Sequence, residues 1–155
     1  MRLTVYTDYA LRVLMYAALH PARLSTIGEI SKVYGISRNH LTKVVYELGV
    51  AGYIETVRGQ QGGIRLARPA QGIGLGDVVR HTEKGAVIVP CFDAATNYCA
   101  ISPVCKLKRA LHQASNAFFA VLDGFTLADL TSNREILSDL LQHSAAASAP
   151  DRAAS

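Results

Sequence analysis

The segment between residues 24 and 67 constrains the fold of this chain more than any other, because glycines and apolar spacing set an order of short elements. Residues 24–35 predict a short helix that ends at a glycine. Ser37 then caps a second helix, which Gly52 ends. The apolar side chains of this second helix recur on one face at helical spacing: Leu41, Val44, Val45 and Leu48. Two helices joined by a short glycine-containing turn predict a helix-turn-helix.

The residues after the second helix predict a β-hairpin. Tyr53–Arg58 and Ile64–Ala67 have strand-like composition, and the GQQGG stretch between them supplies the glycines that a hairpin turn needs. A hairpin in this place is a wing, and its backbone approaches DNA closely because glycine has no Cβ. Helix, helix-turn-helix and wing in this order indicate binding to duplex DNA. The alternative is a pair of ordinary packed helices with a polar outer face.

The charge of the chain is unevenly spread. The formal net charge is +4. Residues 1–82 hold ten Lys and Arg against five Asp and Glu, whereas residues 83–155 hold six against seven. A basic half-chain favours a polyanionic partner, most simply nucleic acid.

The DNA-contacting candidates are polar side chains on the outer face of the second helix and at the wing. Most of them donate to phosphates or to base edges. His40 is equally compatible with a packing role. The candidates on the second helix are Arg38, Asn39, His40 and Lys43, and those on the wing are Arg58, Gln60, Gln61 and Arg65.

The remaining segments predict a mainly α fold with a small β wing. A first helix spans residues 7–19 and is capped by Thr7 or Asp8, and short helices cover 72–83 and 134–143. The expected divisions are a winged helix-turn-helix domain over 1–82, a cysteine-bearing loop over 83–102, a dimerisation helix and C-terminal helix over 103–143, and a disordered tail over 144–155.

A long helix is predicted from Pro103 onwards. Its apolar residues recur at steps of four and three, which is a heptad stripe: Leu107, Leu111, Ala114, Phe118, Val121 and Phe125. Such a helix beside a small DNA-binding domain favours a homodimer, whose two reading helices would lie about 34 Å apart. The alternative is a helix folded back onto its own domain.

All three cysteines of the chain lie within fifteen residues, as Cys91, Cys99 and Cys105. Their spacing is wider than that of zinc ribbons and knuckles, and it suits the larger iron–sulfur clusters. Cys105 is placed in the first turn of the long helix, where the helix dipole stabilises negative charge. Two alternatives stay open at this point: thiol sensing without a cluster, and three unrelated buried cysteines.

The sequence lacks the patterns that are typical of membrane proteins, secreted proteins and common enzymes. No apolar run is long enough to span a membrane, and residues 1–12 lack the features of a signal peptide. We therefore expect a cytoplasmic location, where thiols stay reduced. The sequence holds no catalytic Ser-His-Asp set and no phosphate loop, so we expect a protein that is not an enzyme.

The assembled motifs resemble one bacterial family. The stretches LTVYTDYALRVLMYAA, SRNHL, RGQQGGIRL, CAISPVCKLKRAL and LDGFTLADL are similar to the NsrR branch of a winged-helix repressor family that also contains IscR, over residues 1–143. The resemblance implies a homodimeric repressor with one iron–sulfur cluster per subunit held by the three cysteines, usually 4Fe–4S, with 2Fe–2S as the other form. It further implies binding to the promoter DNA of nitric-oxide detoxification genes and release when nitric oxide attacks the cluster.

The resemblance also bears on a fourth cluster ligand. IscR-like proteins use a histidine three residues after the third cysteine, and Lys108 stands there in this chain. In NsrR-like proteins a carboxylate near the N-terminus of the other subunit fills this role, and Asp8 is the matching residue. Otherwise Asp8 is a helix cap or an exposed carboxylate. Two further hypotheses remain: a regulator that senses oxidants or cysteine through thiols alone, and a winged-helix scaffold that binds protein.

Overall fold

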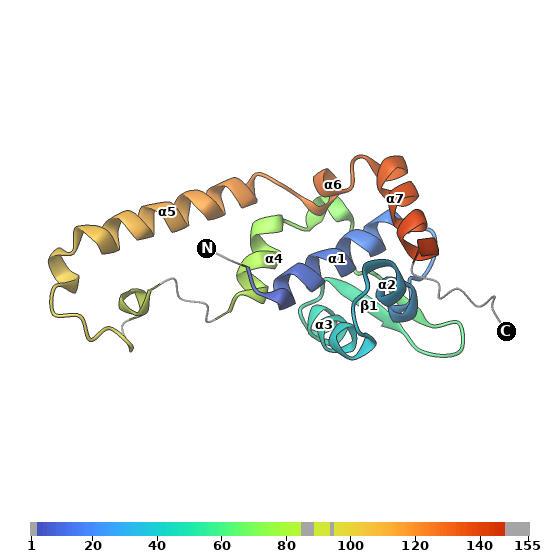
Figure 1. The fold of residues 1–155 in the computed structure, drawn as a ribbon, viewed down its shortest axis with the longest axis horizontal. Coiled ribbons are helices and arrows are strands. Elements are labelled where there is room, and N and C mark those ends of the chain that lie inside the picture. The colour runs from blue at the N-terminus through green and yellow to red at the C-terminus, as the bar shows by residue number, and fades with distance from the viewer. Residues whose placement is uncertain (1–2, 85–88, 94, 148–155) are drawn as a thin grey trace.

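The computed structural model describes residues 3–84, 89–93 and 95–147. The described part is mainly helical with one two-stranded antiparallel sheet, which confirms the predicted fold class. Figure 1 shows a body of packed helices from which one long helix, α5, projects as an arm. No helix in the described ranges combines the length and the apolar composition that crossing a membrane requires.

The elements follow the predicted order. The helices are α1 (Val5–Leu19), α2 (Ile27–Tyr34), α3 (Arg38–Val50), α4 (Leu75–Thr82), α5 (Lys106–Asp123), α6 (Leu127–Leu130) and α7 (Arg134–Ala147). The strands are β1 (Ile54–Val57) and β2 (Gly63–Leu66), and the short 3-10 turns are η1 (Ala70–Gly72), η2 (Pro90–Phe92) and η3 (Ser102–Val104).

Helix α1 lies at the centre of the body. Ala10, Val13 and Leu14 are fully buried, and the helix contacts α3, α4, α6 and β2. Its buried side chains join those of α2, α3, the wing and α4 in one hydrophobic core. Burial at about 25 cal/mol per Å² of apolar surface stabilises this arrangement, which therefore holds the helix-turn-helix and the wing as one unit.

The start of α1 differs from the sequence prediction. The helix begins at Val5, and Thr4 is its N-cap, so the prediction of Thr7 or Asp8 as the cap was wrong. The Thr4 hydroxyl accepts a hydrogen bond from the Thr7 amide at 3.2 Å. Thr7 lies inside the first turn and is fully buried. A sequence pattern does not separate these candidates, because all three residues are good caps.

The Thr7 hydroxyl is part of a hydrogen-bonded cluster that joins the start of α1 to the end of α4. It donates to a carboxylate oxygen of Glu83, the residue that follows α4, and it lies 2.9 Å from the Thr82 hydroxyl. The amide and the hydroxyl of Thr4 donate to the same Glu83 oxygen at 2.7 and 2.9 Å. This cluster fixes the first turn of α1 at the point where the chain leaves the body for the cysteine loop.

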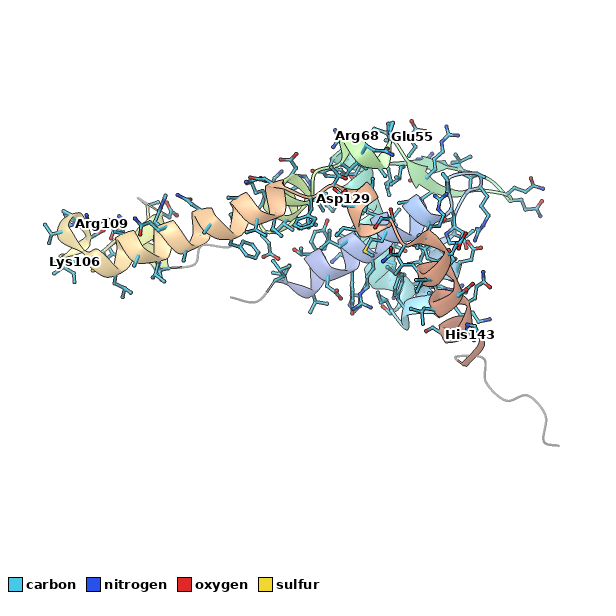
Figure 2. The ribbon with its side chains drawn as sticks, turned by 90° about the horizontal axis from the view of Figure 1, so that it is seen from above. Glu55, Arg68, Lys106, Arg109, Asp129 and His143 are labelled. Atoms are coloured by element: carbon cyan, nitrogen blue, oxygen red, sulfur yellow. The ribbon has the colours of Figure 1, made fainter. Side chains whose placement is uncertain are left out.

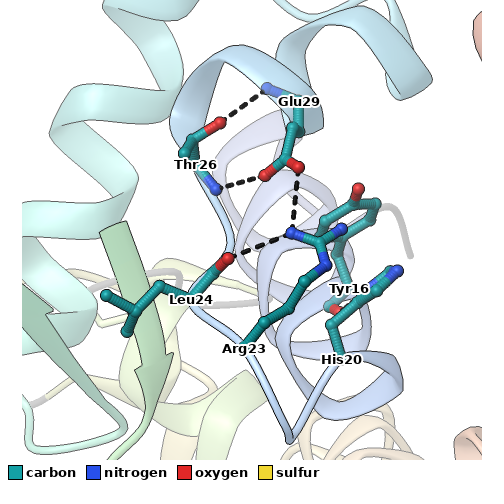
Figure 3. A network of polar contacts seen from close by, with 6 residues as sticks. All are labelled: Tyr16, His20, Arg23, Leu24, Thr26 and Glu29. Atoms are coloured by element: carbon teal, nitrogen blue, oxygen red, sulfur yellow. Dashed lines mark hydrogen bonds and ion pairs between the residues drawn. The ribbon is translucent and has the colours of Figure 1, made fainter. Parts of the chain in front are cut away.

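The helix-turn-helix is held by capping. Thr26 and Glu29 form a reciprocal capping box at the start of α2, and Arg23 donates to Glu29 at 2.9 Å and to the Leu24 carbonyl at 3.0 Å (Figure 3). Gly35 ends α2 with a φ of 64°, a conformation that side chains other than glycine rarely adopt. The predicted helix end at Gly35 and the predicted cap at Ser37 are confirmed.

The wing is a short hairpin tied to the α1–α2 loop. Ile54 pairs with Leu66 and Val57 with Gly63. The first strand is therefore one residue shorter at each end than predicted, and the second has the predicted length but begins one residue earlier. Gly62 is required in the turn, because a Cβ there would collide with the Val57 carbonyl. At the other side, Ser25 pairs with Ile64 through two backbone hydrogen bonds of 2.9 and 2.7 Å. The base of the wing is thus fixed relative to α2.

The boundaries of α5 also differ from the prediction. The helix begins at Lys106, because Pro103 lies in the 3-10 turn η3 and Cys105 is the N-cap. The helix ends at Asp123, so Phe125 of the predicted heptad stripe lies outside it.

The C-terminal part contains more helix than the sequence predicts. Helix α6, which a capping box of Thr126 and Asp129 starts, was not predicted. Helix α7 reaches Ala147 and packs on α2, so the predicted disordered tail begins too early. The rest of that tail, 148–155, lies outside the described residues.

We predict that removal of the Ser25 hydroxyl stabilises the fold. Its side chain is fully buried, and within the described part of the chain the hydroxyl oxygen has no hydrogen-bond partner. Ser25→Ala should raise the free energy of unfolding by about 1 kcal/mol, because a buried unpaired hydroxyl costs about that much. The neighbouring Thr26→Ala, which removes a cap, should lower it by about 1 kcal/mol. Urea unfolding measures both, and a loss of stability in Ser25→Ala would contradict the assignment.

The Glu83 cluster predicts a pH-dependent contribution to stability. Partial burial raises the pKa of Glu83, but the hydrogen bonds from Thr7 and Thr4 lower it by more, so the pKa lies below its ordinary value. The stabilisation is therefore present above the unfolded pKa of about 4.3 and is lost as the pH falls through the folded value.

Glu83→Gln should lower the free energy of unfolding by roughly 1 kcal/mol at pH 7, a figure reduced for solvent screening, and by less at pH 3. Urea titrations at both pH values measure the difference. Asp139→Asn, an exposed carboxylate on α7, is the control and should change little. An equal loss for Glu83→Gln at the two pH values would show that the carboxylate charge has no part in the cluster.

Candidate DNA-binding surface and cysteine loop

Helix α3 presents one buried and one exposed face. Leu41 and Leu48 are fully buried against the core, and Val44 and Val45 are nearly so. The Ser37 cap fixes where the helix starts, and therefore which residues face outward. The four predicted DNA-contacting residues of this helix are all exposed: Arg38, Asn39, His40 and Lys43.

His40 has a neighbour that the sequence did not indicate. Its ring lies 6.1 Å from the ring of Tyr9 on α1, measured between centroids. The side chain is nonetheless exposed, so it is available on the outer face while leaning on α1. The position of His40 is therefore compatible both with DNA contact and with packing against α1.

The wing places its four candidates on the surface, but their charges are not equivalent. Arg65 forms an ion pair with Glu55 across the hairpin at 2.9 Å. Arg58 has no carboxylate partner among the residues that the structure describes. The sequence analysis did not identify Glu55 as an ion-pair partner of Arg65. The two residues pair across the hairpin, and a register counted from the GQQGG turn could have indicated this. The wing candidates are Arg58, Gln60, Gln61 and Arg65, and all are exposed.

The three cysteines are free and occupy different settings. Cys91 is half-buried in η2, and Cys99 is exposed. Cys105 is half-buried and caps α5, because its sulfur accepts a hydrogen bond from the Lys108 amide at 3.3 Å. The prediction that Cys105 lies inside the first turn was off by one position, and its sulfur still faces the free N–H groups there.

Polar and ring contacts hold the cysteine loop against the start of α5. Ser102 is 7% exposed, and its hydroxyl accepts hydrogen bonds from the Asn97 side chain and from the Lys108 ammonium, each at 2.9 Å. The ring of Phe92 lies 5.5 Å from that of His112 on α5. Lys108 is therefore engaged in holding the loop. The loop and α5 form one substructure at the end of the arm.

The predicted metal ligands do not converge in this single chain. In the described ranges, no three His, Cys, Asp or Glu side chains are grouped as a metal ion requires. Asp8 lies on α1 and forms an ion pair with Arg12 at 2.9 Å, with its side chain 49% exposed. Figure 2 shows Lys106, next to Cys105, at the far end of the arm, well away from the body that contains α1.

The predicted dimerisation stripe is uncovered. No residue of α5 is buried, and Leu107 and Val121 are 67% and 63% exposed. Figure 1 shows the arm extending from the body, so the alternative of a helix folded back on its own domain is not what the structure shows. The stripe residues other than Phe125 lie on α5: Leu107, Leu111, Ala114, Phe118 and Val121.

Residues 3–133 match the Rrf2 family, described as an iron-dependent transcriptional regulator. The chain is 54% identical over 143 residues to the HTH-type transcriptional regulator NsrR of Bacillus subtilis (strain 168), which covers 92% of this chain and 98% of that protein. It is 51% identical to NsrR of Geobacillus kaustophilus (strain HTA426), over 92% of this chain and 97% of that protein.

Solved structures with the same fold include IscR of T. potens, with a TM-score of 0.69 and 25% identity over 86% of this chain and 88% of that one. CymR (YrzC), the global cysteine regulator of B. subtilis, has the same TM-score and identity over 86% of this chain and 98% of that one. The prediction that the chain is not an enzyme is confirmed, because these relatives are regulators. The chain belongs to the Rrf2 family of transcriptional regulators.

Proposed function

We propose that the protein is an iron–sulfur-cluster-containing transcriptional repressor that binds promoter DNA as a homodimer. In this proposal it releases the DNA when nitric oxide attacks the cluster, and genes for nitric-oxide detoxification are then expressed. The observation that carries the proposal is the position of the cysteines. All three are free, and their loop lies at the end of an uncovered apolar arm that projects from a DNA-binding body.

The donor set fits an iron–sulfur cluster in its chemistry. Cys91, Cys99 and Cys105 are the three thiols, and thiolates are the usual ligands of such clusters, whether 4Fe–4S or 2Fe–2S. When bound, the cluster supplies iron with which nitric oxide reacts. The chain itself contributes the Lys108 amide at the Cys105 sulfur and the Ser102 contacts that hold the loop on α5. These contacts fix the Cys105 sulfur at the start of α5 and hold the loop beside it.

A second copy of the chain is needed for the fourth ligand in this proposal. Asp8 belongs to the body, whereas the cysteines belong to the arm, and the two are not grouped within one chain. An arm with an apolar stripe is suited to crossing a partner and reaching the partner's body. The Asp8 carboxylate is half exposed, so it is accessible once it leaves Arg12. A carboxylate holds iron less tightly than a thiolate does.

The DNA-contacting role rests on the α3 and wing surface. Of the two wing arginines, Arg58 has a charge that no carboxylate of the described residues neutralises, whereas Glu55 offsets that of Arg65. We therefore assign Arg58 as the stronger phosphate contact. The Cβ-free glycine turn beside it lets the backbone come close to the duplex.

A second candidate function is a thiol-based regulator without a cluster. The observation that favours it is the fold similarity to CymR, which is named as a global cysteine regulator. The exposed Cys99 is accessible to oxidants, as such sensing requires. The two candidates differ in whether iron is present in the purified protein.

The wing arginines give the first test of this proposal. Arg58→Gln should reduce the slope of log affinity against log salt by about one, because one phosphate contact is lost. Arg65→Gln should reduce it by roughly half as much, because Glu55 already offsets that charge. Fluorescence anisotropy with a duplex that the wild type selects from a random library measures both slopes.

Glu55→Gln is the matched variant, because it frees Arg65 from its partner without removing a positive charge. It should tighten binding and steepen the salt dependence. Equal losses for Arg58→Gln and Arg65→Gln, together with no change for Glu55→Gln, would contradict the assigned difference between the two arginines.

Nitric oxide gives the second test. Protein purified without oxygen should contain iron and sulfide and should absorb visible light. Titration with nitric oxide should change this spectrum and lower DNA affinity by at least about tenfold, within the usual range of coupling between sites. Asp8→Ala should alter the spectrum or weaken the link between nitric oxide and DNA release.

Asp139→Asn serves as the control carboxylate for Asp8→Ala and should behave as the wild type does. A colourless, iron-free protein that releases DNA on thiol oxidation would contradict the cluster and favour the thiol-based alternative. If Asp8→Ala still holds a cluster, and its spectrum and nitric-oxide response are unchanged, then Asp8 is not the fourth ligand. This result would not contradict the cluster itself.

A further inference from the structure

The arm is attached to the body mainly at its C-terminal end, where α5 meets α4. No residue of α5 is buried along its 18 positions, so its direction is not set by a core of its own. The direction is set where the chain turns back into the body after Asp123. This turn, residues 123–127, and the α4 residues that contact it are here called the elbow.

An arginine–aspartate clasp crosses the elbow. The Arg80 guanidinium on α4 donates two hydrogen bonds to the Asp123 carboxylate at the end of α5, at 2.7 and 2.6 Å. The same guanidinium lies over the Phe119 ring, 4.7 Å from its centroid. A bidentate pair fixes both distance and orientation, and the stacking fixes the rotation of α5 about its axis. The clasp therefore contacts α5 at two points one turn apart.

The backbone around the clasp is also shaped for close approach. Gly76 on α4 is buried, and a Cβ at this position would overlap the Asp123 carboxylate. On the other side of the elbow, the Leu75 amide donates to the Phe125 carbonyl at 2.9 Å, and the Leu127 amide donates to the Ile73 carbonyl at 2.8 Å. Leu127 and Ile73 belong to the core. The elbow is thus anchored in the body, and the clasp sets the angle at which α5 leaves it.

The exposure of the clasp argues against a role in stability alone. The side chains of Arg80 and Asp123 are 44% and 46% exposed, and ion pairs at such positions contribute little to folding. The pKa of Asp123 nevertheless lies below its ordinary value because of the hydrogen bonds from Arg80. Both carboxylate oxygens of Asp123 are engaged by the guanidinium, so the pair constrains the direction of α5.

A small change at the elbow moves the body by a large distance. An arm of 18 residues is about 27 Å long at 1.5 Å per residue, so a rotation of about 10° displaces one end by about 5 Å. One base pair step advances the duplex by about 3.4 Å and rotates it by about 34°. A tilt of this size therefore corresponds to more than one base pair.

We propose that the clasp of Arg80, Asp123 and Phe119, seated on Gly76, sets the distance between the two DNA-binding bodies of the dimer and so selects the spacing of DNA half-sites. This inference rests on the proposed homodimer. Arg80 and Asp123 are positioning residues, because they lie on α4 and at the end of α5, apart from the α3 and wing surface. They act through the angle of α5.

The test compares binding to duplexes that differ only in half-site spacing. The half-sites are those that the wild type selects from a random duplex library, and the spacing is varied from two base pairs shorter to two longer. The full-length protein is purified without oxygen. The wild type should lose about tenfold or more in affinity for each base pair away from the optimum. Arg80→Gln should reduce this discrimination to less than about threefold.

Charge exchange and a conservative variant separate geometry from folding. Arg80→Asp and Asp123→Arg should each flatten the spacing profile, and the double variant should restore a sharp optimum. Arg80→Lys keeps the charge but not the bidentate fork, so it should be intermediate. Arg23→Gln is the matched control, because it removes a similarly exposed ion pair, Arg23–Glu29 at 2.9 Å, outside the elbow. Its profile should match that of the wild type.

The outcomes distinguish this inference from the proposed function beneath it. A uniform loss of affinity at every spacing in the Arg80 and Asp123 variants, with the position and sharpness of the optimum unchanged, overturns the clasp as a spacing device and leaves the dimer intact. A wild-type protein that is monomeric by light scattering, or that binds one half-site as tightly as two, overturns the homodimer and this inference with it. Thermal unfolding of each variant confirms that a flattened profile comes from a folded protein.

Discussion

The burial of α1 is the interaction on which the rest of this structure depends. Ala10, Val13 and Leu14 are fully buried between the helix-turn-helix on one side and α4 and α6 on the other. Because α1 packs against both sides, the exposed face of α3 and the base of the arm belong to the same packed unit. The Glu83 cluster completes this unit at the first turn of α1, next to Asp8.

The arm contrasts with this body, because it has an apolar stripe and no core of its own. Exposure of apolar residues such as Leu107 and Val121 to water costs free energy. A partner surface that covers these residues removes this cost. The chain thus divides the two tasks of the proposed function. The body presents the DNA-contacting side chains, and the arm presents the thiols together with the surface that a second copy would cover.

The sequence predicts well what short-range patterns determine. The helix-turn-helix, the wing and α5 follow from apolar spacing and from glycines at the turns, such as Gly35. Helix starts are predicted less well, because neighbouring residues are equally good caps. The cap of α1 is Thr4, whereas Thr7 or Asp8 was predicted, and α5 begins after Pro103. Contacts between distant residues, such as Arg80 with Asp123, leave no pattern in a single sequence. The cysteines were identified by their clustering in the sequence. Their spacing does not reveal that, in the described part of a single chain, they are not grouped as a metal site requires.

The division between body and arm also constrains how a signal would travel in the proposed repressor. The body is closed around α1, so its reading helix does not depend on the cysteine loop for its internal packing. Asp8 is held by Arg12 within one chain, and a bond from Asp8 to a partner's cluster would add a link between one body and the other arm. Loss of that link would leave each body folded and would change only the constraint between the two. A repressor built in this way releases DNA through the placement of its two reading surfaces, and each surface keeps its own structure.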